Sequence, residues 1–391
     1  IRFDGFTYDW EQRKLGDVFE QTSNLVNPKE DEIELWSLTV EDGLTKKSDR
    51  YNREFLVKKD DNFKEVRPGD IVYNPMNMTL GAVGYNGMAK SVAVSGYYTT
   101  MVAKENYDTY YINTWLKSPQ AIRLYRTYAT GSLIEKQRVQ FPTLSIIPVT
   151  FPKYEEQIKI GSYFHSIDNL ITLHQRKCEQ TKKMKKYMLQ KMFPQNGAKV
   201  PEIRFDGFTY DWEQRKLGDV AEFSKGNGYS KGDLIESGTP IILYGRLYTK
   251  YETIISEVDT YVEAKEGSVY SKGGEVIVPA SGETAEDIAR AATVDKSGIL
   301  LGGDLNVVMP NKDINPAFLA ISISNGNSQR ELSKKAQGKS VVHIHNEEIR
   351  NLVIPFPNKV EQNKIVAYFA NLDHLITLHQ RQHKLHLNML L

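Results

Sequence analysis

Two stretches of the chain carry apolar residues in alternating steps of four and three, and each stretch is long enough for an extended helix. This spacing is the heptad pattern of a coiled coil, in which one seam of a helix packs against a partner helix. His174 and Cys178 continue the first seam, and His379 and His383 continue the second. The eight apolar residues that we expect to form the seams are Ile160, Phe164, Ile167, Ile171, Ile365, Phe369, Leu372 and Ile376.

Both predicted helices begin directly after a proline, Pro152 in the first stretch and Pro357 in the second. The first helix should run to about Phe193, where Pro194 and Gly197 interrupt it. A helix of about 40 residues is a rod of about 60 Å. Two like helices related by a two-fold axis perpendicular to them would pack antiparallel, which would place one globular domain at each end.

The chain is built twice at the scale of a domain. Residues 1–18 return letter for letter at residues 203–220, and residues 170–176 are identical to residues 375–381. The period is far longer than the roughly 20 to 50 residues of a solenoid repeat. Between the matching ends the two copies are nearly equal in length but share almost no sequence. This favours one fold that carries two different binding surfaces over a tandem duplication that has simply drifted.

The repeat and the helices divide the chain into four expected segments. These are a globular domain over residues 1–151, a long helix with its linker over 152–196, a globular domain over 197–356 and a long helix over 357–391. Only ten residues follow Arg381, whereas 26 lie between Arg176 and the second copy, so we expect the second helix to be cut short.

Short apolar runs bounded by Gly, Asn and Pro predict strands inside both globular domains. The runs are residues 70–73, 91–94, 275–278 and 305–308. The pattern as a whole indicates an α+β protein: two mixed α/β domains joined by two long antiparallel helices, with a pseudo-two-fold internal repeat. Loops 74–79 and 280–287 carry amide, hydroxyl and carboxylate groups that suit the edges of bases, although each loop taken singly is more typical of an ordinary turn.

Composition narrows the function classes. A chain of 391 residues and 44.6 kDa exceeds one typical core, so two or three domains are expected. The net charge of +1 supplies no global attraction to nucleic acid, and any such binding must come from local patches. The single cysteine, Cys178, excludes an internal disulfide and a Cys-rich zinc site and indicates a reducing cytosol. No apolar run reaches the roughly 20 residues that a membrane span requires.

Patterns typical of catalysis or metal binding are poor. Residues 337–340 imitate the end of a phosphate-binding loop, but the required first glycine would fall at Ser333. The grouped histidines lack carboxylates at a familiar metal spacing. These histidines are His343, His345, His379, His383 and His386. We therefore expect no catalytic residue, no metal and no cofactor site in this chain.

Both ends of each repeat resemble a known family. Residues 10–17 and 212–219 both read Trp-Glu-Gln-Arg-Lys-Leu-Gly-Asp. They are similar to the segment that opens each target-recognition domain in the specificity subunit of type I restriction-modification enzymes. The Phe-Pro at residues 151–152 and 356–357, followed by Glu-Gln and a long helix, is similar to the closing stretch of those domains. Residues 281–287 resemble a recurrent loop of the same domains. The resemblance covers the whole chain.

The resemblance implies a non-catalytic, cytoplasmic DNA-binding subunit. Each target-recognition domain would read one half of a bipartite asymmetric target in double-stranded DNA, and the helices would set the gap between the halves. The implied partners are two modification subunits, which dock on this chain and methylate adenine with S-adenosylmethionine, and restriction subunits, which use ATP and Mg²⁺ to translocate and cut. These cofactors would belong to the partners and none of them to this chain.

The residues that we expect to contact DNA are polar or basic and come from both variable domains. In the first domain they are Asn74, Asn77, Lys90, Arg123, Arg126 and Arg138; in the second they are Arg246, Ser281, Thr284, Arg290, Lys335 and Lys339. An Arg that binds a guanine edge through two hydrogen bonds contributes about 1 to 3 kcal/mol of discrimination, whereas a Lys bound to phosphate changes affinity more evenly across sequences.

Two other function classes stay open at this point. A tandem binding protein outside restriction-modification, such as a transcription regulator or a carbohydrate binder, could also use two divergent domains on a rod. A self-sufficient enzyme with an unrecognised site is the second alternative. Tight association with methyltransferase subunits would argue against the first, and methyl transfer by the isolated chain would favour the second.

Overall fold

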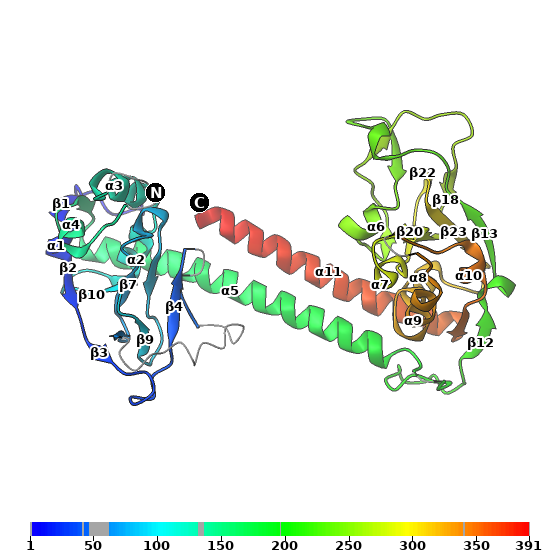
Figure 1. The fold of residues 1–391 in the computed structure, drawn as a ribbon, viewed down its shortest axis with the longest axis horizontal. Coiled ribbons are helices and arrows are strands. Elements are labelled where there is room, and N and C mark those ends of the chain that lie inside the picture. The colour runs from blue at the N-terminus through cyan, green and yellow to red at the C-terminus, as the bar shows by residue number, and fades with distance from the viewer. Residues whose placement is uncertain are drawn as a thin grey trace. The chain divides into compact units, whose positions relative to one another are not determined.

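The computed structural model describes residues 2–40, 43–46, 62–131, 137–195, 197–338 and 341–390. They form two compact units. The first unit is Ile1–Leu173 with His383–Leu391, and the second is His174–Gln382. Two long helices, α5 (Tyr154–Lys191, 38 residues) and α11 (Lys359–Leu390, 32 residues), each contribute to both units (Figure 1). No helix among the described residues is long and apolar enough to cross a membrane.

The core of the first unit lies between a four-stranded antiparallel sheet of order β2-β10-β7-β8 and a group of helices (Figure 1). The sheet strands are β2 (Phe19–Thr22), β7 (Ile71–Tyr73), β8 (Val83–Tyr85) and β10 (Thr99–Ala103). The helices are α1 (Leu15–Val18), η2 (Met78–Leu80), α2 (Thr109–Leu116), α3 (Pro119–Tyr128) and α4 (Phe141–Ser145). Tyr111, Trp115 and Tyr125 are large helix side chains that are buried in this core.

Smaller sheets complete the first unit. The order β3-β6-β9 makes a three-stranded sheet, and two further pairs of strands are present. The strands are β1 (Glu11–Lys14) paired with β11 (Pro148–Phe151), β3 (Leu25–Val26), β4 (Trp36–Thr39) paired with β5 (Gly43–Lys46), β6 (Phe63–Val66) and β9 (Val92–Ser95). The β1–β11 pair joins the opening and closing ends of the repeat.

The second unit also opens and closes with a paired strand, β12 with β25, but its sheets are larger. Its main sheet has the order β13-β23-β19-β21-β16, and a second five-stranded sheet has the order β14-β17-β15-β22-β18. The main strands are β13 (Ala221–Lys225), β16 (Ile254–Ile255), β19 (Glu275–Pro279), β21 (Ala292–Val294) and β23 (Leu305–Pro310). The second sheet contains β14 (Leu234–Ile235), β15 (Thr239–Ile242), β17 (Tyr261–Val262), β18 (Tyr270–Lys272) and β22 (Ser297–Leu301). All four stretches predicted as strands are strands in the two units, β7, β9, β19 and β23.

Two short pairs and several helices complete the second unit. The pairs are β12 (Glu213–Lys216) with β25 (Val353–Phe356), and β20 (Ser281–Gly282) with β24 (Val342–His343). The helices are η4 (Leu217–Asp219), η5 (Lys231–Asp233), α6 (Arg246–Thr249), α7 (Ala285–Ile288), α8 (Pro316–Ile323), α9 (Gly326–Lys335) and α10 (Asn346–Arg350). Helix α8 is apolar on nearly every side and lies in the centre of the core, which explains its lack of a polar face.

A glutamine in each long helix makes the same hydrogen bonds in both units and explains why the Glu-Gln motif is repeated. The Gln157 side chain accepts from the Asp108 backbone N–H at 3.1 Å and donates to the Pro152 carbonyl at 2.8 Å. Gln362 accepts from the Asn315 N–H at 2.7 Å and donates to the Pro357 carbonyl at 2.9 Å. Asp108 and Asn315 also cap α2 and α8. One side chain therefore ties the start of the long helix to the cap of a core helix.

The glutamate of the same motif holds the opening segment of each copy. Glu361 is buried and accepts two hydrogen bonds from the Arg204 guanidinium, at 2.7 and 2.8 Å. In the first unit Arg2 lies 3.3 Å from the buried carboxylate of Glu156. Aromatic contacts repeat as well. The rings of Phe3 and Tyr163, and those of Phe205 and Tyr368, meet edge to face at 5.9 and 6.1 Å. The matching sequences at the two ends of each copy thus contact one another directly.

The repeated tryptophan differs between the units. Trp212 is 2 % exposed, whereas Trp10, in the same local sequence, is 37 % exposed. The Phe193 ring, which follows the end of α5, meets the Trp212 ring edge-on at 6.0 Å, and Phe318 meets it at 5.8 Å. Burial at this position therefore depends on a residue supplied from outside the repeated segment.

The predicted seam residues have two roles. Ile160 and Phe164 pack in the core of the first unit, and Ile365 and Phe369 pack in the core of the second. Leu372 joins the same core, and Ile167 is also buried, whereas Ile171 and Ile376 are half-buried. The first turns of each long helix therefore contact their own globular core, which the heptad pattern alone did not distinguish from contact with the other helix.

Within the second unit the two long helices run antiparallel. The His174 and His379 rings meet with their Nδ1 atoms 3.1 Å apart, and Lys185, further along α5, donates to Asp373, earlier on α11, at 2.5 Å. A rising residue number on one helix thus pairs with a falling number on the other.

Candidate nucleic-acid interface

The two variable loops occupy equivalent places in the two sheets. In the first unit the loop from Asn74 to Ala82 joins β7 to β8, which are antiparallel neighbours. In the second unit the residues from Ala280 to Ala291 join β19 to β21, which are also antiparallel neighbours. The short helix η2 lies in the first loop, and α7 lies in the second. The same connection therefore carries different side chains in each unit.

A second segment lies against each loop and is held by the same backbone hydrogen bond. The Val139 N–H donates to the Pro75 carbonyl at 3.0 Å, and the Ile344 N–H donates to the Ala280 carbonyl at 3.1 Å. The residue before Val139 and the residue before Ile344 each form a β-bridge with a residue just after the preceding helix, α3 or α9. These bridges are Thr130 with Arg138 and Gln337 with His343. Each unit therefore presents one surface built from a strand-joining loop and a returning segment.

Four of the residues expected to contact DNA in the first unit lie on this surface. Asn74 accepts the Met76 N–H at 3.0 Å and so shapes the turn, while Asn77 and Arg138 are exposed. Arg126 on α3 is exposed and donates to the Thr79 carbonyl of the loop at 3.3 Å. The amides and guanidiniums are thus gathered on one loop and its neighbours.

The other two expected residues of the first unit lie outside this group. Arg123 is exposed on α3, one turn before Arg126. Lys90 follows β8 and forms an ion pair with Glu34 at 3.1 Å. Hydrogen bonds from Trp36 and Lys90 lower the pKa of Glu34 to about 2. The Lys90 charge is therefore partly matched within the protein.

In the second unit three of the residues expected to contact DNA already form hydrogen bonds or ion pairs within the protein. Ser281 is buried, and its hydroxyl lies 3.1 Å from Nδ1 of His343. Thr284 caps α7 by accepting the Asp287 N–H at 3.1 Å. Arg290 donates to the Leu247 carbonyl at 3.1 Å and forms an ion pair with Asp287 at 3.4 Å. These contacts orient the loop before any ligand is bound.

Lys335 and Lys339 were also expected to contact DNA. Lys335 is the last residue of α9, two residues before Gln337, which forms the bridge with His343. Lys339 lies outside the described residues.

Arg246 does not belong to this surface. Its side chain is 7 % exposed and binds Asp259 at 2.6 Å, Glu252 at 2.9 Å and the Glu257 carbonyl at 2.9 Å. Hydrogen bonds from Lys250 and Arg246 hold the pKa of Asp259 well below its usual range. The buried guanidinium is already paired with two exposed carboxylates and a backbone carbonyl, so Arg246 stabilises the fold and is not a candidate for contact with DNA in this conformation.

His343 is the residue that the sequence reasoning missed. Its bridge to Gln337 places it where the first unit has Arg138, and the residue after each of them donates to the strand-joining loop. His343 is exposed, and its ring is stacked on that of His345, with the ring centroids 6.5 Å apart and an angle of 8° between the ring planes. The offset that aligns the Phe-Pro motifs of the two copies also aligns Arg138 with His343, so the sequence contained the signal.

The described side chains of this surface are hydrogen-bond donors and acceptors. Among the described residues no group of three or more His, Cys, Asp or Glu side chains could hold a metal ion. The surface groups are amides, hydroxyls, imidazoles and guanidiniums, which can bind base edges and phosphates.

Comparison with known proteins supports the resemblance seen in the sequence. The family model described as "Type I restriction modification DNA specificity domain" matches residues 8–183 and 210–388. The specificity subunit of the type I restriction enzyme MjaVIII of Methanocaldococcus jannaschii is 23% identical over 354 residues, which cover 86% of this chain and 80% of the relative.

Two solved structures share the fold. The S subunit of a type I restriction-modification system from M. genitalium has a TM-score of 0.60 at 13% identity, with 98% of this chain and 94% of that chain covered. A chain from a structure that concerns assembly and conformational transition of the type I R-M system has a TM-score of 0.51 at 15% identity, with 97% and 94% covered. At these identities the likeness establishes the two-domain α+β fold.

Proposed function

Because the chain belongs to the family of type I restriction-modification DNA specificity proteins, in which it is a non-catalytic DNA sequence-specificity subunit, we propose that its two units read the two halves of a bipartite, asymmetric DNA target. The observation that supports this proposal is that one scaffold holds two different polar surfaces. The Pro75–Val139 and Ala280–Ile344 hydrogen bonds occupy the same place, while the side chains around them differ. Two equivalent scaffolds that carry different surface side chains would recognise two different half-site sequences.

The first half-site would be contacted by Asn74, Asn77, Arg126 and Arg138, with Arg123 toward the phosphates. The second would be contacted through Ser281, Thr284, Arg290, Lys335 and Lys339. An exposed Arg such as Arg138 is suited to a guanine edge, whereas Lys335 is suited to phosphate. A net charge of only +1 means that affinity must come from these local groups and from partner subunits.

The long helices would set the distance between half-sites and would dock two modification subunits. Helix α5 with 38 residues has a length of about 57 Å, more than one turn of DNA, which is about 34 to 36 Å. The modification subunits would bind S-adenosylmethionine, restriction subunits would use ATP and Mg²⁺, and this chain would need none of these cofactors. The complex would act in the cytoplasm.

Reconstitution with the modification subunits tests the proposal. Purified complex is incubated with DNA and S-adenosylmethionine, and methylated adenines are mapped across many sequences. We expect a motif of two unlike halves separated by a fixed gap. Arg138→Ala should relax one half only, and Arg290→Ala the other only. A contiguous motif, or methylation without sequence preference, would contradict the proposal.

A further inference from the structure

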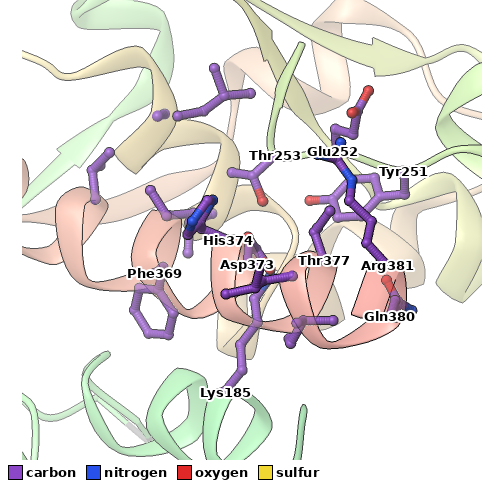
Figure 2. Close-up of a pocket in the computed structure, with 17 residues that line it drawn as sticks. Lys185, Tyr251, Glu252, Thr253, Phe369, Asp373, His374, Thr377, Gln380 and Arg381 are labelled. Atoms are coloured by element: carbon purple, nitrogen blue, oxygen red, sulfur yellow. The ribbon is translucent and has the colours of Figure 1, made fainter. Parts of the chain in front are cut away.

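The second unit contains a cavity of about 520 Å³ that the proposed DNA surface does not use. Figure 2 shows its labelled residues approaching from three places: Phe369 to Arg381 on α11, Tyr251 to Thr253 on the loop before β16, and Lys185 on α5. Ala317 of α8 and Ala370 of α11 also line it. A cavity of this volume lies in the range that is typical of ligand-binding sites.

The internal repeat shows what the same place holds in the first unit. The matching hydrogen bonds of Gln157 and Gln362 align α2 with α8 and α5 with α11. In this alignment Tyr110 corresponds to Ala317, and His165 corresponds to Ala370. The rings of Tyr110 and His165 meet edge to face at 4.5 Å. Two rings thus occupy in the first unit a position that two alanines leave open in the second.

The second unit lacks a ring equivalent to that of Tyr110, but it retains an equivalent of the carboxylate that binds the Tyr110 hydroxyl. In the first unit the Tyr110 hydroxyl donates to the Asp168 carboxylate. Asp373 of α11 is the equivalent of Asp168, and it lines the cavity. One of its oxygens, Oδ1, accepts from Lys185 at 2.5 Å, so the carboxylate is held in place on the cavity wall. The cavity therefore combines the space of an aromatic ring with an acceptor for a phenolic hydroxyl.

We propose that this cavity binds a tyrosine side chain of a modification subunit. The inference rests on the proposed function, in which modification subunits dock on this chain. The ring would lie against Ala317 and Ala370, and its hydroxyl would donate to Asp373, as Tyr110 does to Asp168 in the first unit. Neighbouring residues of the same partner segment would fill the remaining volume and meet Glu252 and Arg381 at the rim. Tyrosine suits such a role because it combines a large apolar ring with a polar tip.

Filling the cavity with the residue of the first unit tests the proposal. Ala370→His places a ring where His165 has one, and because Ala370 is exposed on the cavity wall the change should not disturb folding. Ala367→His is the matched control, since Ala367 is exposed on the same helix and does not line the cavity. The dissociation constant of each full-length variant for the modification subunit is measured by calorimetry, with circular dichroism as a check of folding.

We expect Ala370→His to weaken the complex about tenfold or more, the loss typical of a buried aromatic anchor, and Ala367→His to leave it within about twofold. The small phenol p-cresol should show saturation transfer from the wild-type chain at millimolar concentration and none from Ala370→His. Wild-type affinity in the Ala370→His variant would overturn the assignment of the cavity. Failure of the wild-type chain to bind modification subunits would instead overturn the docking role in the proposed function.

Discussion

Removal of the Arg204 guanidinium should destabilise the second unit far more than removal of Arg2 destabilises the first. The two arginines stand at equivalent positions of the repeat, but their surroundings differ. The Arg204 and Glu361 side chains are 14 % and 1 % exposed and share two hydrogen bonds. The Arg2 side chain is 38 % exposed and has one contact with Glu156, at 3.3 Å.

The magnitude follows from what each substitution leaves behind. Arg204→Ala strands a buried carboxylate that has lost two charge-assisted hydrogen bonds, a change that costs about 3 to 5 kcal/mol. Arg2→Ala also leaves a buried carboxylate, that of Glu156, but it removes only a single, longer contact made by a partly exposed arginine, so a smaller cost of about 1 kcal/mol is expected. The Glu361→Gln background should reduce the cost of Arg204→Ala to about 1 kcal/mol, because a neutral amide is left unpaired at lower cost than a charge.

Hydrogen exchange measured by mass spectrometry can assign the loss to one unit. The amides of β12 and β25, which are paired in the second unit, should exchange between about 100-fold and about 3000-fold faster in Arg204→Ala, since 1.4 kcal/mol corresponds to about a factor of ten. The amides of β1 and β11 in the first unit serve as the internal control. A cost below about 1 kcal/mol, or an equal cost in the Glu361→Gln background, would refute the claim that the stranded charge is the cause.

Three further outcomes are expected. Because the pKa of Glu34 is lowered from 4.5 to about 2, its ion pair should be intact above pH 4.5 and lost as the pH falls toward 2, and Glu34→Gln should abolish that change in an acid titration followed by NMR. Arg246→Ala should cost the second unit about 2 kcal/mol in urea unfolding, because it removes a buried side chain with its hydrogen bonds but leaves only exposed carboxylates, whereas Arg138→Ala should stay within about 0.5 kcal/mol and affect DNA binding instead; equal costs would contradict their different burial. Phe193→Ala should expose Trp212 and shift its fluorescence to longer wavelength, and an unchanged spectrum would argue against the packing that we describe.

The positions of the long helices and strands follow from local sequence patterns that occur in both copies of the repeat. The heptad spacing, the prolines before each long helix and the strand-like runs all act through neighbours in sequence, and the two long helices and the four strands are found where they were expected. The repeat itself also specified equivalent positions, which is how Arg138 leads to His343.

Burial depended on contacts between residues distant in sequence. Identical opening segments leave Trp10 37 % exposed and Trp212 2 % exposed, because Phe193 covers only the second. Arg246 looks like any surface arginine until Asp259 and Glu252 are seen to surround it. The cavity beside Ala370 exists because small residues from two helices meet. The local spacing of apolar residues determines which segments form helices or strands. The solvent exposure of a side chain depends instead on which distant parts of the chain pack against it.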